Sequence, residues 1–467
     1  MWGGLGRGKM MKDRNYTHSI QIDADKCIGC SHCMRVCSTQ AIRIDDGLAH
    51  IQPEWCVDCG ECYRVCPQKA VYAKSDAPEA HNPDIYRIAL IPAVFIGQFP
   101  SEYSATQIME AVKKTGFDEV FEVEQAIDFL KEEYKTKFQP DRPRPYISSF
   151  CPAVVRLIQV EYPSLTPHIL PIKAPHDLAA IYLRQSVKQK GVDPDSVFIY
   201  YITPCAAKTV AARAPVGEKE SPINGTINMQ EMYNKVAKIL AVEKKSNLHK
   251  TYANMSPDSV NWSLSGTEKR YFAGRSLAID GMDNVIEFLE KLESGHISDI
   301  DFLETRACDQ GCAGGILCPV NRFLTVERLE QRQKKLQSLI DDNRGEKNAL
   351  MEYAGYLHEV SSVEPIYPRD GLLLDEDMEK ALVKLQRINK LLTYLPGFDC
   401  GACGSPSCSN LAEDIVKGKA SISHCVFVQR VMEKNYKLSP EQAFTVIEKI
   451  WGKDRLNKYN ERSGHES

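Results

Sequence analysis

The chain has 467 residues, which at about 150 residues per domain predicts about three structural units. Its formal net charge is −4, with 26% charged and 43% hydrophobic residues. This ordinary globular composition argues against a disordered protein and against a basic nucleic-acid binder, so we expect no nucleic-acid partner. No apolar run approaches the roughly 18 residues of a membrane span, and residues 1–20 lack the apolar stretch of a signal peptide. We therefore expect a cytoplasmic protein without membrane contact.

Clustered cysteines are the strongest signal, and in a reducing compartment they indicate metal ligands rather than disulfides. The first eight of the 17 cysteines form the spacing C-x2-C-x2-C-x3-C twice, and Pro67 follows the second copy. In this spacing three close cysteines bind one iron–sulfur cubane while the fourth crosses to the other cubane. We therefore expect one 4Fe–4S cluster on Cys27, Cys30, Cys33 and Cys66, and a second on Cys37, Cys56, Cys59 and Cys62. Zinc is the alternative, but it does not explain a three-plus-one spacing written twice.

Residues 18–75 resemble the bacterial two-cluster ferredoxins, and alternation at residues 41–44 predicts a small strand. The long region that follows alternates apolar strand-like runs with helical patterns, which predicts an α/β layer architecture. Its predicted elements are strands at residues 87–91, 117–123 and 197–202 and helices at residues 104–116 and 124–134. Sheets of this kind place functional sites at the ends of their strands.

Five more cysteines lie in this α/β region. Four of them fall in the loop segments SSFCPAV, TPCAAK and CDQGCAGG and are Cys151, Cys205, Cys308 and Cys312. The glycines Gly311, Gly314 and Gly315 permit a close approach of the backbone to a bulky group. Four loop cysteines can bind a third cubane, which leaves Cys318 as a spare thiol.

After residue 325 the chain becomes charged, and residues 326–343 and 375–395 carry apolar residues at helical spacing. We expect these helices to pack on the core and to lead into a terminal cluster. Its C-x2-C-x4-C-x16-C ligands are Cys400, Cys403, Cys408 and Cys425. Residues 390–430 resemble a small single-cluster 4Fe–4S domain, in which Gly401 and Gly404 let the backbone bend around the cluster.

A structural zinc is the alternative for this terminal site. His424 is expected to be a surface neighbour, because four thiolates already complete the ligand set. The last residues, from 452 onward, are expected to be frayed.

The segments SSFCPAV, PCAAK and CDQGCAGG, in this order after a ferredoxin-like module, resemble the three signature segments of the iron-only (FeFe) hydrogenases. The resemblance covers residues 18–325 and implies that the four loop cysteines bind a cubane. It also implies that the Cys312 thiolate bridges to a diiron subsite with CO, cyanide and an azadithiolate, which completes the H-cluster. Lys208 matches the lysine that holds a cyanide ligand in this family, with an ordinary surface lysine as the alternative.

With this resemblance the predicted fold class is α/β with α+β modules. We expect a ferredoxin-like domain at residues 1–80, a two-lobed α/β H-cluster domain at residues 81–385 and a small iron–sulfur domain at residues 386–467. The implied cofactors are the H-cluster and three accessory 4Fe–4S clusters.

Several positions depart from the family pattern. Phe150 stands where a proton-transferring cysteine is usual, Ala211 replaces a glutamate, Arg306 replaces a methionine, and Val154 replaces a tryptophan. Glu304 matches the glutamate that opens the third segment, with a structural carboxylate paired with the arginine as the alternative. Because the cluster ligands are kept while their surroundings change, we expect an intact H-cluster with slow turnover.

These departures and the extra terminal cluster resemble the divergent hydrogenases proposed to be sensory, in the branch without a PAS-type domain called group D. Phe150 would then break the usual proton relay. The charge of Arg306 would raise the potential of the subsite by favouring its more negative state. Cys318 is interpreted as a small buried hydrophobe, with a thiol that replaces the missing relay cysteine or caps an open iron as the alternative.

The predicted function is slow, sensory interconversion of H2 with two protons and two electrons. The alternatives are a ferredoxin-linked H2-metabolising enzyme, a cubane-only iron–sulfur assembly or scaffold protein, and a plain electron carrier, which leaves the α/β region unexplained. Expected partners are H2 and protons, a redox or signalling protein, and hydrogenase maturation proteins. The oligomeric state stays open, with a homodimer among the alternatives.

Overall fold

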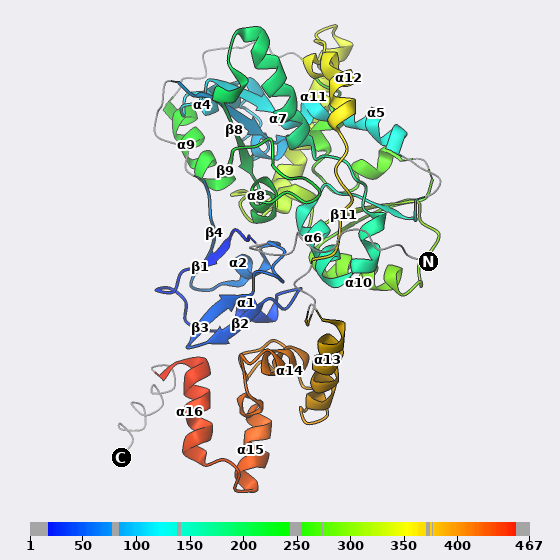
Figure 1. The fold of residues 1–467 in the computed structure, drawn as a ribbon. Coiled ribbons are helices and arrows are strands. Elements are labelled where there is room, and N and C mark those ends of the chain that lie inside the picture. The colour runs from blue at the N-terminus through cyan, green and yellow to red at the C-terminus, as the bar shows by residue number, and fades with distance from the viewer. Residues whose placement is uncertain are drawn as a thin grey trace.

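Three units follow one another along the long direction of the molecule (Figure 1), with the large α/β unit at one end, the ferredoxin-like unit in the middle and a helical terminal unit at the other end. The fold comes from a computed structural model, which describes residues 17–76, 84–137, 142–242, 254–272, 274–369, 374–375 and 377–453. Two segments with expectations from the sequence lie outside the described residues. They are residues 1–16, where no signal peptide is expected, and residues 454–467 of the tail that is expected to be frayed.

The ferredoxin-like unit consists of two antiparallel strand pairs, with one short helix beginning inside each cysteine motif. The pairs are β1 (Ile20–Ile22) with β4 (Val71–Ala73) and β2 (Ile42–Asp45) with β3 (Leu48–Ile51), and the helices are α1 (His32–Arg35) and α2 (Glu61–Val65). β2 confirms the strand expected at residues 41–44. Its alternating Ile42 and Ile44 are buried against Met34, so this strand packs on the helix of the first cysteine motif.

The large unit contains a parallel sheet in the order β6-β5-β8-β9. Its strands are β5 (Tyr86–Ile91), β6 (Glu119–Glu122), β8 (Val197–Thr203) and β9 (Gly225–Asn228). Helices cover both faces and are α4 (Ala105–Lys113), α5 (Ile127–Lys137), α7 (Pro175–Ser186) and α9 (Met229–Val242). Alternate residues of β5 face opposite sides, so Ala89 packs with α4 and α9 while Leu90 packs with α5 and α7. The predicted α/β architecture is confirmed.

A second parallel sheet, in the order β10-β11-β7, forms the other lobe of this unit. Its strands are β7 (Tyr146–Ile147), β10 (Ser276–Asp280) and β11 (Phe302–Arg306). The apolar faces of α6 (Pro152–Glu161) and α10 (Met282–Glu293) pack with it in one buried cluster. Because all strands within each sheet run parallel, the loops after them gather at one edge, which is where the cysteine segments lie.

Three further helices complete the large unit: α3 (Ala93–Ile96), α8 (Ala206–Arg213) and α12 (Ala354–Val360). The helix expected at residues 326–343 is α11 (Arg322–Asp341), which packs on the core through the fully buried Leu329. Leu329 also contacts the chain at Gly97, where an added Cβ would lie 3.2 Å from its Cγ. α11 is therefore a fixed wall of the large unit.

The terminal unit contains α13 (Met378–Leu392), α14 (Cys408–Val416), α15 (Val426–Lys434) and α16 (Pro440–Trp451). α13 is continuous through residue 385, where the sequence analysis expected a domain boundary. Ile388 of α13 packs on Leu411 of α14, so the helix packs within the terminal unit. The expected boundary at residue 385 stays a prediction, but it falls inside this helix, whose apolar face packs on α14.

The terminal unit docks on the β2–β3 hairpin through backbone hydrogen bonds. The amide of Ile44 donates to the carbonyl of Gly404 at 2.8 Å, Asp46 donates to Lys449 at 2.8 Å, and Gly47 donates to Ile450 at 3.0 Å. Beside them the ion pair of Arg43 with Asp414 is 2.6 Å long. Main-chain pairing of this kind fixes the terminal unit against the ferredoxin-like unit.

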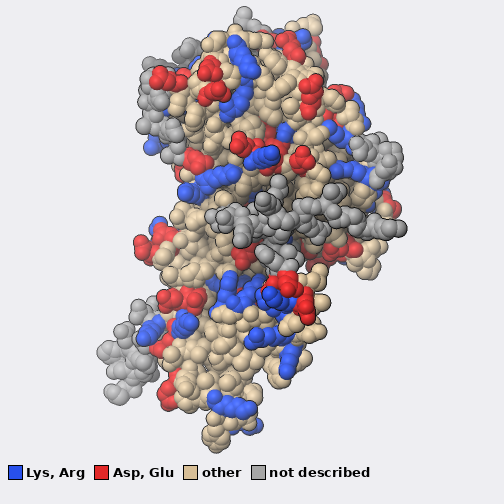
Figure 2. Space-filling view, in the orientation of Figure 1, with Lys and Arg blue, Asp and Glu red and all other residues tan. Residues whose placement is uncertain are grey.

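Charge on the surface is mixed rather than segregated. Figure 2 shows Lys and Arg interspersed with Asp and Glu over the visible face of all three units. Across the described ranges, every helix falls short of the length and apolar character that crossing a lipid bilayer requires.

The docking interface predicts a matched pair of glycine variants. Gly404 has φ +77, and an added Cβ would overlap the carbonyl oxygen of Ile44, whereas Gly418 has φ +75 and open space around it. Gly404→Ala should therefore loosen the docked terminal unit and speed hydrogen exchange at the amides of Asp46 and Gly47 about tenfold. Gly418→Ala carries the same cost of about 1–2 kcal/mol for left-handed backbone and should leave those amides unchanged. Equal exchange in the two variants would contradict this account of the interface.

Candidate metal centres

Four thiols from both halves of the ferredoxin-like unit surround one cavity. The cavity is lined by Cys37, Cys56, Cys59 and Cys62. Burial raises the pKa of Cys59 to about 12, and the neighbouring Cys37 raises it further. The structure thus brings Cys37 to the triplet of the second motif, as a crossover of the fourth ligand requires.

The remaining four thiols of this unit also gather. Burial raises the pKa of Cys33 to about 12, followed by the effects of Cys30 and Cys27, with a smaller contribution from Cys66. The two crossing cysteines have equivalent surroundings, because the amide of Ala41 donates to Cys37 Sγ and the amide of Ala70 donates to Cys66 Sγ, each at 3.2 Å. Amide donors of this kind favour the thiolate over the thiol.

These donor sets fit iron–sulfur clusters. A buried thiol with a raised pKa loses its proton only to a strong positive charge, and all-thiolate sets are typical of clusters. Within the described residues, no three His, Cys, Asp or Glu side chains come close enough to share a single metal ion. Each thiolate of a cubane binds a different iron atom, so four cluster ligands do not need to share one.

The terminal cysteines form a third group at the docked end of the terminal unit, where Cys403, Cys408 and Cys425 pack in one apolar cluster and Cys400 is exposed. Burial raises the pKa of Cys403 to about 11, and the thiols of Cys425 and Cys400 contribute. His424 lies beside them, but its Nδ1 accepts from the amide of Ser421 at 3.1 Å.

The glycines of this segment have a different role from the one expected. Gly401 and Gly404 do have left-handed backbone, at φ +74 and +77. However, an added Cβ at Gly401 would lie 2.9 Å from Cε of Met34, and at Gly404 it would overlap the backbone of Ile44. Close docking on the ferredoxin-like unit therefore requires both glycines, beyond any bend around a cluster.

The four loop cysteines come together from the ends of strands in both sheets. Cys151 begins α6 after β7, Cys205 begins α8 after β8, and Cys308 and Cys312 follow β11. The pKa of Cys205 is raised to about 12, chiefly by burial; the Lys208 ammonium opposes this rise, while Cys312 and Cys151 add to it. Burial also raises the pKa of Cys308, followed by Cys205 and Cys151. The four thiols are thus mutual neighbours in the interior.

The glycines around Cys312 pack backbone on backbone. A Cβ added at Gly311 would overlap the carbonyl of Ser263, at Gly315 it would overlap that of Pro204, and at Gly314 it would overlap that of Asp309. The expected close approach is real, but the structure shows protein backbone as the partner at these positions. This close backbone packing holds the Cys312 loop against the loop of Cys205.

Lys208 is buried, not a surface lysine. It is 3% exposed, and its Nζ donates to Cys312 Sγ at 3.3 Å. Burial alone would lower the pKa of Lys208, but Cys312 and Tyr201 raise it above its usual value. The side chain faces a small enclosed cavity that Cys312, Tyr201, Phe150 and His176 also line. A permanent cation therefore stands beside the thiol expected to bridge to the subsite.

Phe150 lies between this lysine and a second buried cation. The Lys208 Nζ is 4.5 Å from the centre of the Phe150 ring, and the guanidinium carbon of Arg306 is 4.3 Å from it. Such cation–π contacts contribute about 2 kcal/mol or more when desolvated. The other two departures have different surroundings, because Ala211 lines an adjoining cavity and Val154 is a fully buried core residue.

Glu268 is a site residue that the sequence analysis missed. It pairs with Arg306 at 2.7 Å and accepts hydrogen bonds from Ser148 Oγ at 2.7 Å and from the Tyr134 hydroxyl at 2.7 Å. No motif marks this glutamate. The only available signal was the physical requirement that a buried arginine needs a carboxylate.

Glu304 acts as a structural carboxylate in this network. It lies 3.3 Å from the Arg306 guanidinium and accepts from the amides of Gly266 at 3.0 Å and Lys269 at 2.9 Å. Two carboxylates therefore oppose the charge of Arg306. The expectation that Arg306 raises the potential of a nearby subsite stays a prediction, and these carboxylates would weaken such an effect.

Cys318 is held inside the protein. Its Sγ donates to the Cys312 carbonyl at 3.4 Å and contacts Met229 Sδ at 3.7 Å. Burial raises the pKa of Cys318, which keeps the thiol protonated. These contacts favour the interpretation of Cys318 as a small buried hydrophobe.

Comparisons with known proteins agree with the cysteine pattern. Residues 86–259 match the family described as iron only hydrogenase large subunit, C-terminal domain; residues 20–73 match the 4Fe-4S dicluster domain; and residues 395–427 match a putative Fe-S cluster family. The chain thus carries hydrogenase-type and 4Fe–4S domains and has hydrogenases among its homologues.

The proteins that this chain resembles include both hydrogenases and an Fe-S cluster assembly factor. The chain is 33% identical over 224 residues to the periplasmic [Fe] hydrogenase large subunit of Nitratidesulfovibrio vulgaris, covering 44% of this chain and 53% of that protein, and so spans about half its length. It is 22% identical over 348 residues to a probable cytosolic Fe-S cluster assembly factor of Drosophila persimilis, covering 61% of this chain and 72% of that one. A solved structure of the [FeFe]-hydrogenase HydA1 from Chlamydomonas reinhardtii aligns with a TM-score of 0.44 at 16% identity, over 63% of this chain and 96% of that chain.

The buried network predicts that Arg306→Met is strongly destabilising. Removing the cation leaves Glu268 and Glu304 buried without it, which should lower the free energy of unfolding by about 3–5 kcal/mol. Burial already raises the pKa of Glu304. A carboxyl with a raised folded-state pKa stabilises the fold at low pH and loses that contribution as pH rises through the raised value. The loss should therefore be larger at pH 8 than at pH 6 in urea unfolding of the cluster-loaded protein.

Arg306→Lys is the matched control, because it keeps a cation between the two carboxylates. We expect it to recover most of the stability. A loss that is the same at both pH values, or equal in the two variants, would show that packing rather than charge pairing accounts for the effect.

Proposed function

We propose that this chain is a slow FeFe hydrogenase that interconverts H2 with two protons and two electrons. Cys151, Cys205, Cys308 and Cys312 would hold the cubane of an H-cluster, with Cys312 as the bridging ligand. The observation that carries the proposal is the buried ammonium of Lys208, 3.3 Å from Cys312 Sγ and facing an enclosed cavity. When bound, the diiron subsite would supply a Lewis-acidic iron and a base for splitting H2.

The residues around the cavity support this assignment. An ammonium on a flexible stem suits an anionic ligand such as cyanide, and burial strengthens the attraction. Apolar and aromatic side chains form much of the rest of the wall, including Val94, Ile127, Phe150 and Trp262. They would exclude bulk water from a bound subsite and orient it toward Lys208.

Electrons would leave through the accessory clusters. Cys59 packs in the same apolar cluster as Cys151 and Cys205, which favours the second ferredoxin-type cluster as the neighbour of the cubane. At the far side Cys33 packs in a cluster with Trp451 of the terminal unit. The two electrons from one H2 would pass along this series to a redox or signalling protein at the terminal unit.

Slow turnover is proposed because the usual proton donor is missing. Phe150 carries no ionisable group, and its ring fills the space between two cations. This favours a sensory protein, in which occupancy and redox state matter more than flux, over a ferredoxin-linked metabolic enzyme.

A cubane-only assembly or scaffold protein is the second candidate. The similarity to a cluster assembly factor over 61% of the chain favours it. So does Arg306, which occupies a methionine position of catalytic hydrogenases. In that case the four loop cysteines would hold a cubane and no diiron subsite.

Infrared spectroscopy separates the two candidates. CO and cyanide on iron absorb at about 1800–2100 cm⁻¹, where amino acids do not. After anaerobic maturation we expect bands in this window that shift between H2 and argon. A silent window, from maturation machinery proven on a control hydrogenase, would reject the hydrogenase proposal and favour the scaffold.

Replacing Phe150 tests the proton-transfer argument. Phe150→Cys should raise H2 turnover by about tenfold or more, since a positioned proton donor contributes about 100- to 10,000-fold in enzymes. Phe150→Ala is the control, because it removes the ring and its cation–π contacts without adding a thiol. Turnover measured with an artificial electron carrier should rise in the cysteine variant alone. An equal rise in both variants would mean that the ring, not the missing thiol, limits the rate.

A further inference from the structure

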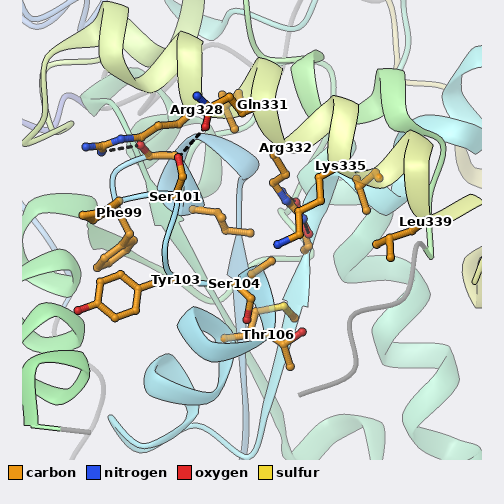
Figure 3. Close-up of a pocket in the computed structure, with 18 of the residues that line it drawn as sticks. Phe99, Ser101, Tyr103, Ser104, Thr106, Arg328, Gln331, Arg332, Lys335 and Leu339 are labelled. Atoms are coloured by element: carbon orange, nitrogen blue, oxygen red, sulfur yellow. Dashed lines mark hydrogen bonds and ion pairs between the residues drawn. The ribbon is translucent and has the colours of Figure 1, made fainter. Parts of the chain in front are cut away.

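A second cavity opens on the large unit, away from all cysteines. It lies between the N-terminal end of α4, the chain that leads from α3 to α4, and one side of α11 (Figure 3). Its volume is about 240 Å³, near the lower end of the range for small-molecule sites. This is enough room for a small organic molecule.

The charge lining this cavity is positive. Three cations on successive turns of α11 line it, namely Arg328, Arg332 and Lys335, against the single carboxylate of Glu122. Arg332 and Glu122 form a bidentate ion pair, with Nη2 2.6 Å from Oε2. Arg328 donates only to carbonyl oxygens, those of Gly97 at 3.2 Å and Gln98 at 2.9 Å. Two positive charges, on Arg328 and Lys335, are therefore not balanced by a carboxylate of the wall.

Lys335 is solvent-exposed, like its neighbour Lys334, but it alone of the two lines the cavity. Figure 3 shows its side chain reaching from α11 toward Ser104 and Thr106 on the opposite wall. In the described part of the chain it has neither an ion pair nor a hydrogen bond. A lysine that faces a cavity without a partner can bind an anion at little cost in broken contacts.

The opposite wall supplies further groups for an anion. α4 begins there, with Ser104 as its cap accepting from the amide of Gln107. The amides of Ala105 and Thr106, in the first turn, have no acceptor within the helix, and a helix N-terminus carries partial positive charge. The first turn of α4 and Lys335 of α11 thus line one cavity from two sides.

The rest of the wall is apolar and aromatic. Phe99, Tyr103 and Met109 lie on one side and Leu336 and Leu339 on the other. The Phe99 ring is held by neighbouring rings, with centroids 5.3 Å from Phe95 and 4.9 Å from Tyr233. A rigid aromatic wall of this kind favours a planar apolar body.

From these observations we infer that the cavity binds a small organic anion, with a carboxylate, sulfonate or phosphate toward Lys335 and the first turn of α4 and an aromatic or apolar body against Phe99 and Leu336. A metal cation is disfavoured by the net positive wall. The inference does not rest on the proposed hydrogenase function, because no cysteine lines this cavity.

The cavity lies next along the chain to segments that line the buried site at Lys208. Glu122 lines this cavity, and Glu124, two residues further along the chain, lines the cavity at Lys208. Oε2 of Glu124 accepts a hydrogen bond from the amide of Ala93 at 2.7 Å. The same α3 ends at Gly97, whose carbonyl Arg328 holds. Both cavities therefore share the β6 end and α3 as a common wall.

Two dyes that differ only in charge test this inference. The probe is 8-anilinonaphthalene-1-sulfonate, an aromatic anion, and its control is N-phenyl-1-naphthylamine, which has the same rings without the sulfonate. Fluorescence titration of the cluster-loaded full chain should show saturable binding of one sulfonate per chain, tighter than that of the neutral dye.

Charge-matched variants locate the site. Lys335→Glu should weaken sulfonate binding about tenfold and leave the neutral dye unchanged, since it reverses one charge near the anion. Lys334→Glu makes the same change in net charge at the exposed neighbouring position outside the cavity and should have no effect. Equal affinity in the two lysine variants would overturn the inference.

A third variant tests the space rather than the charge. Thr106→Trp should abolish binding of both dyes by filling the cavity, while circular dichroism and the iron content report an intact fold. Undiminished binding to a folded Thr106→Trp chain would place the dyes elsewhere and reject the site.

Discussion

The ring of Phe150 is the point at which two buried cations meet, and the need to compensate those charges organises the centre of the large unit. Lys208 donates to Cys312 Sγ, at 3.3 Å, and Arg306 pairs with the carboxylate of Glu268, at 2.7 Å. A charge in a low-dielectric interior costs several kcal/mol unless it is paired, so neither cation can be left alone. This requirement ties the cysteine loops, β11 and the segment of Glu268 to one another.

The way in which each buried charge is paired distinguishes structural residues from residues that can bind a ligand. The charge of Arg306 is paired with the carboxylates of Glu268 and Glu304, so these three residues stabilise the fold. On the Lys208 side the ammonium faces a cavity and a thiol, which leaves it available to a bound group. The two cations are similar in burial, but only Lys208 has unused binding capacity.

Packing between units is as specific as packing within them. The terminal unit joins the ferredoxin-like unit through the β2–β3 hairpin, and Gly404 allows its backbone to approach Ile44 directly. The ferredoxin-like unit joins the large unit through Val57 and Cys59, which share an apolar cluster with Cys151. The cysteine groups are therefore arranged in series because each domain interface lies beside one.

The sequence by itself determined the local features of this protein. Ligand spacing in the cysteine motifs, apolar runs such as residues 87–91 and helical periodicity in residues 326–343 are properties of neighbouring residues, so they can be read along the chain. The resemblance of three ordered segments identified Lys208 as a residue near the cluster. The continuity of α13 through residue 385 was already present in the helical pattern, but its membership of the terminal unit was not.

Only the tertiary structure decided which groups meet across long separations. Glu268 begins a short 3-10 helix without a sequence motif, and its pairing with Arg306 depends on β11 and that helix being brought together by the fold. The glycines beside the cysteines were predicted to make room for clusters, and the structure shows in addition that Gly311, Gly315 and Gly404 make room for other backbone. The cation-lined cavity of α4 and α11 combines residues more than 200 positions apart. Contacts of this kind depend on how elements pack in space, which the order of residues constrains but does not specify.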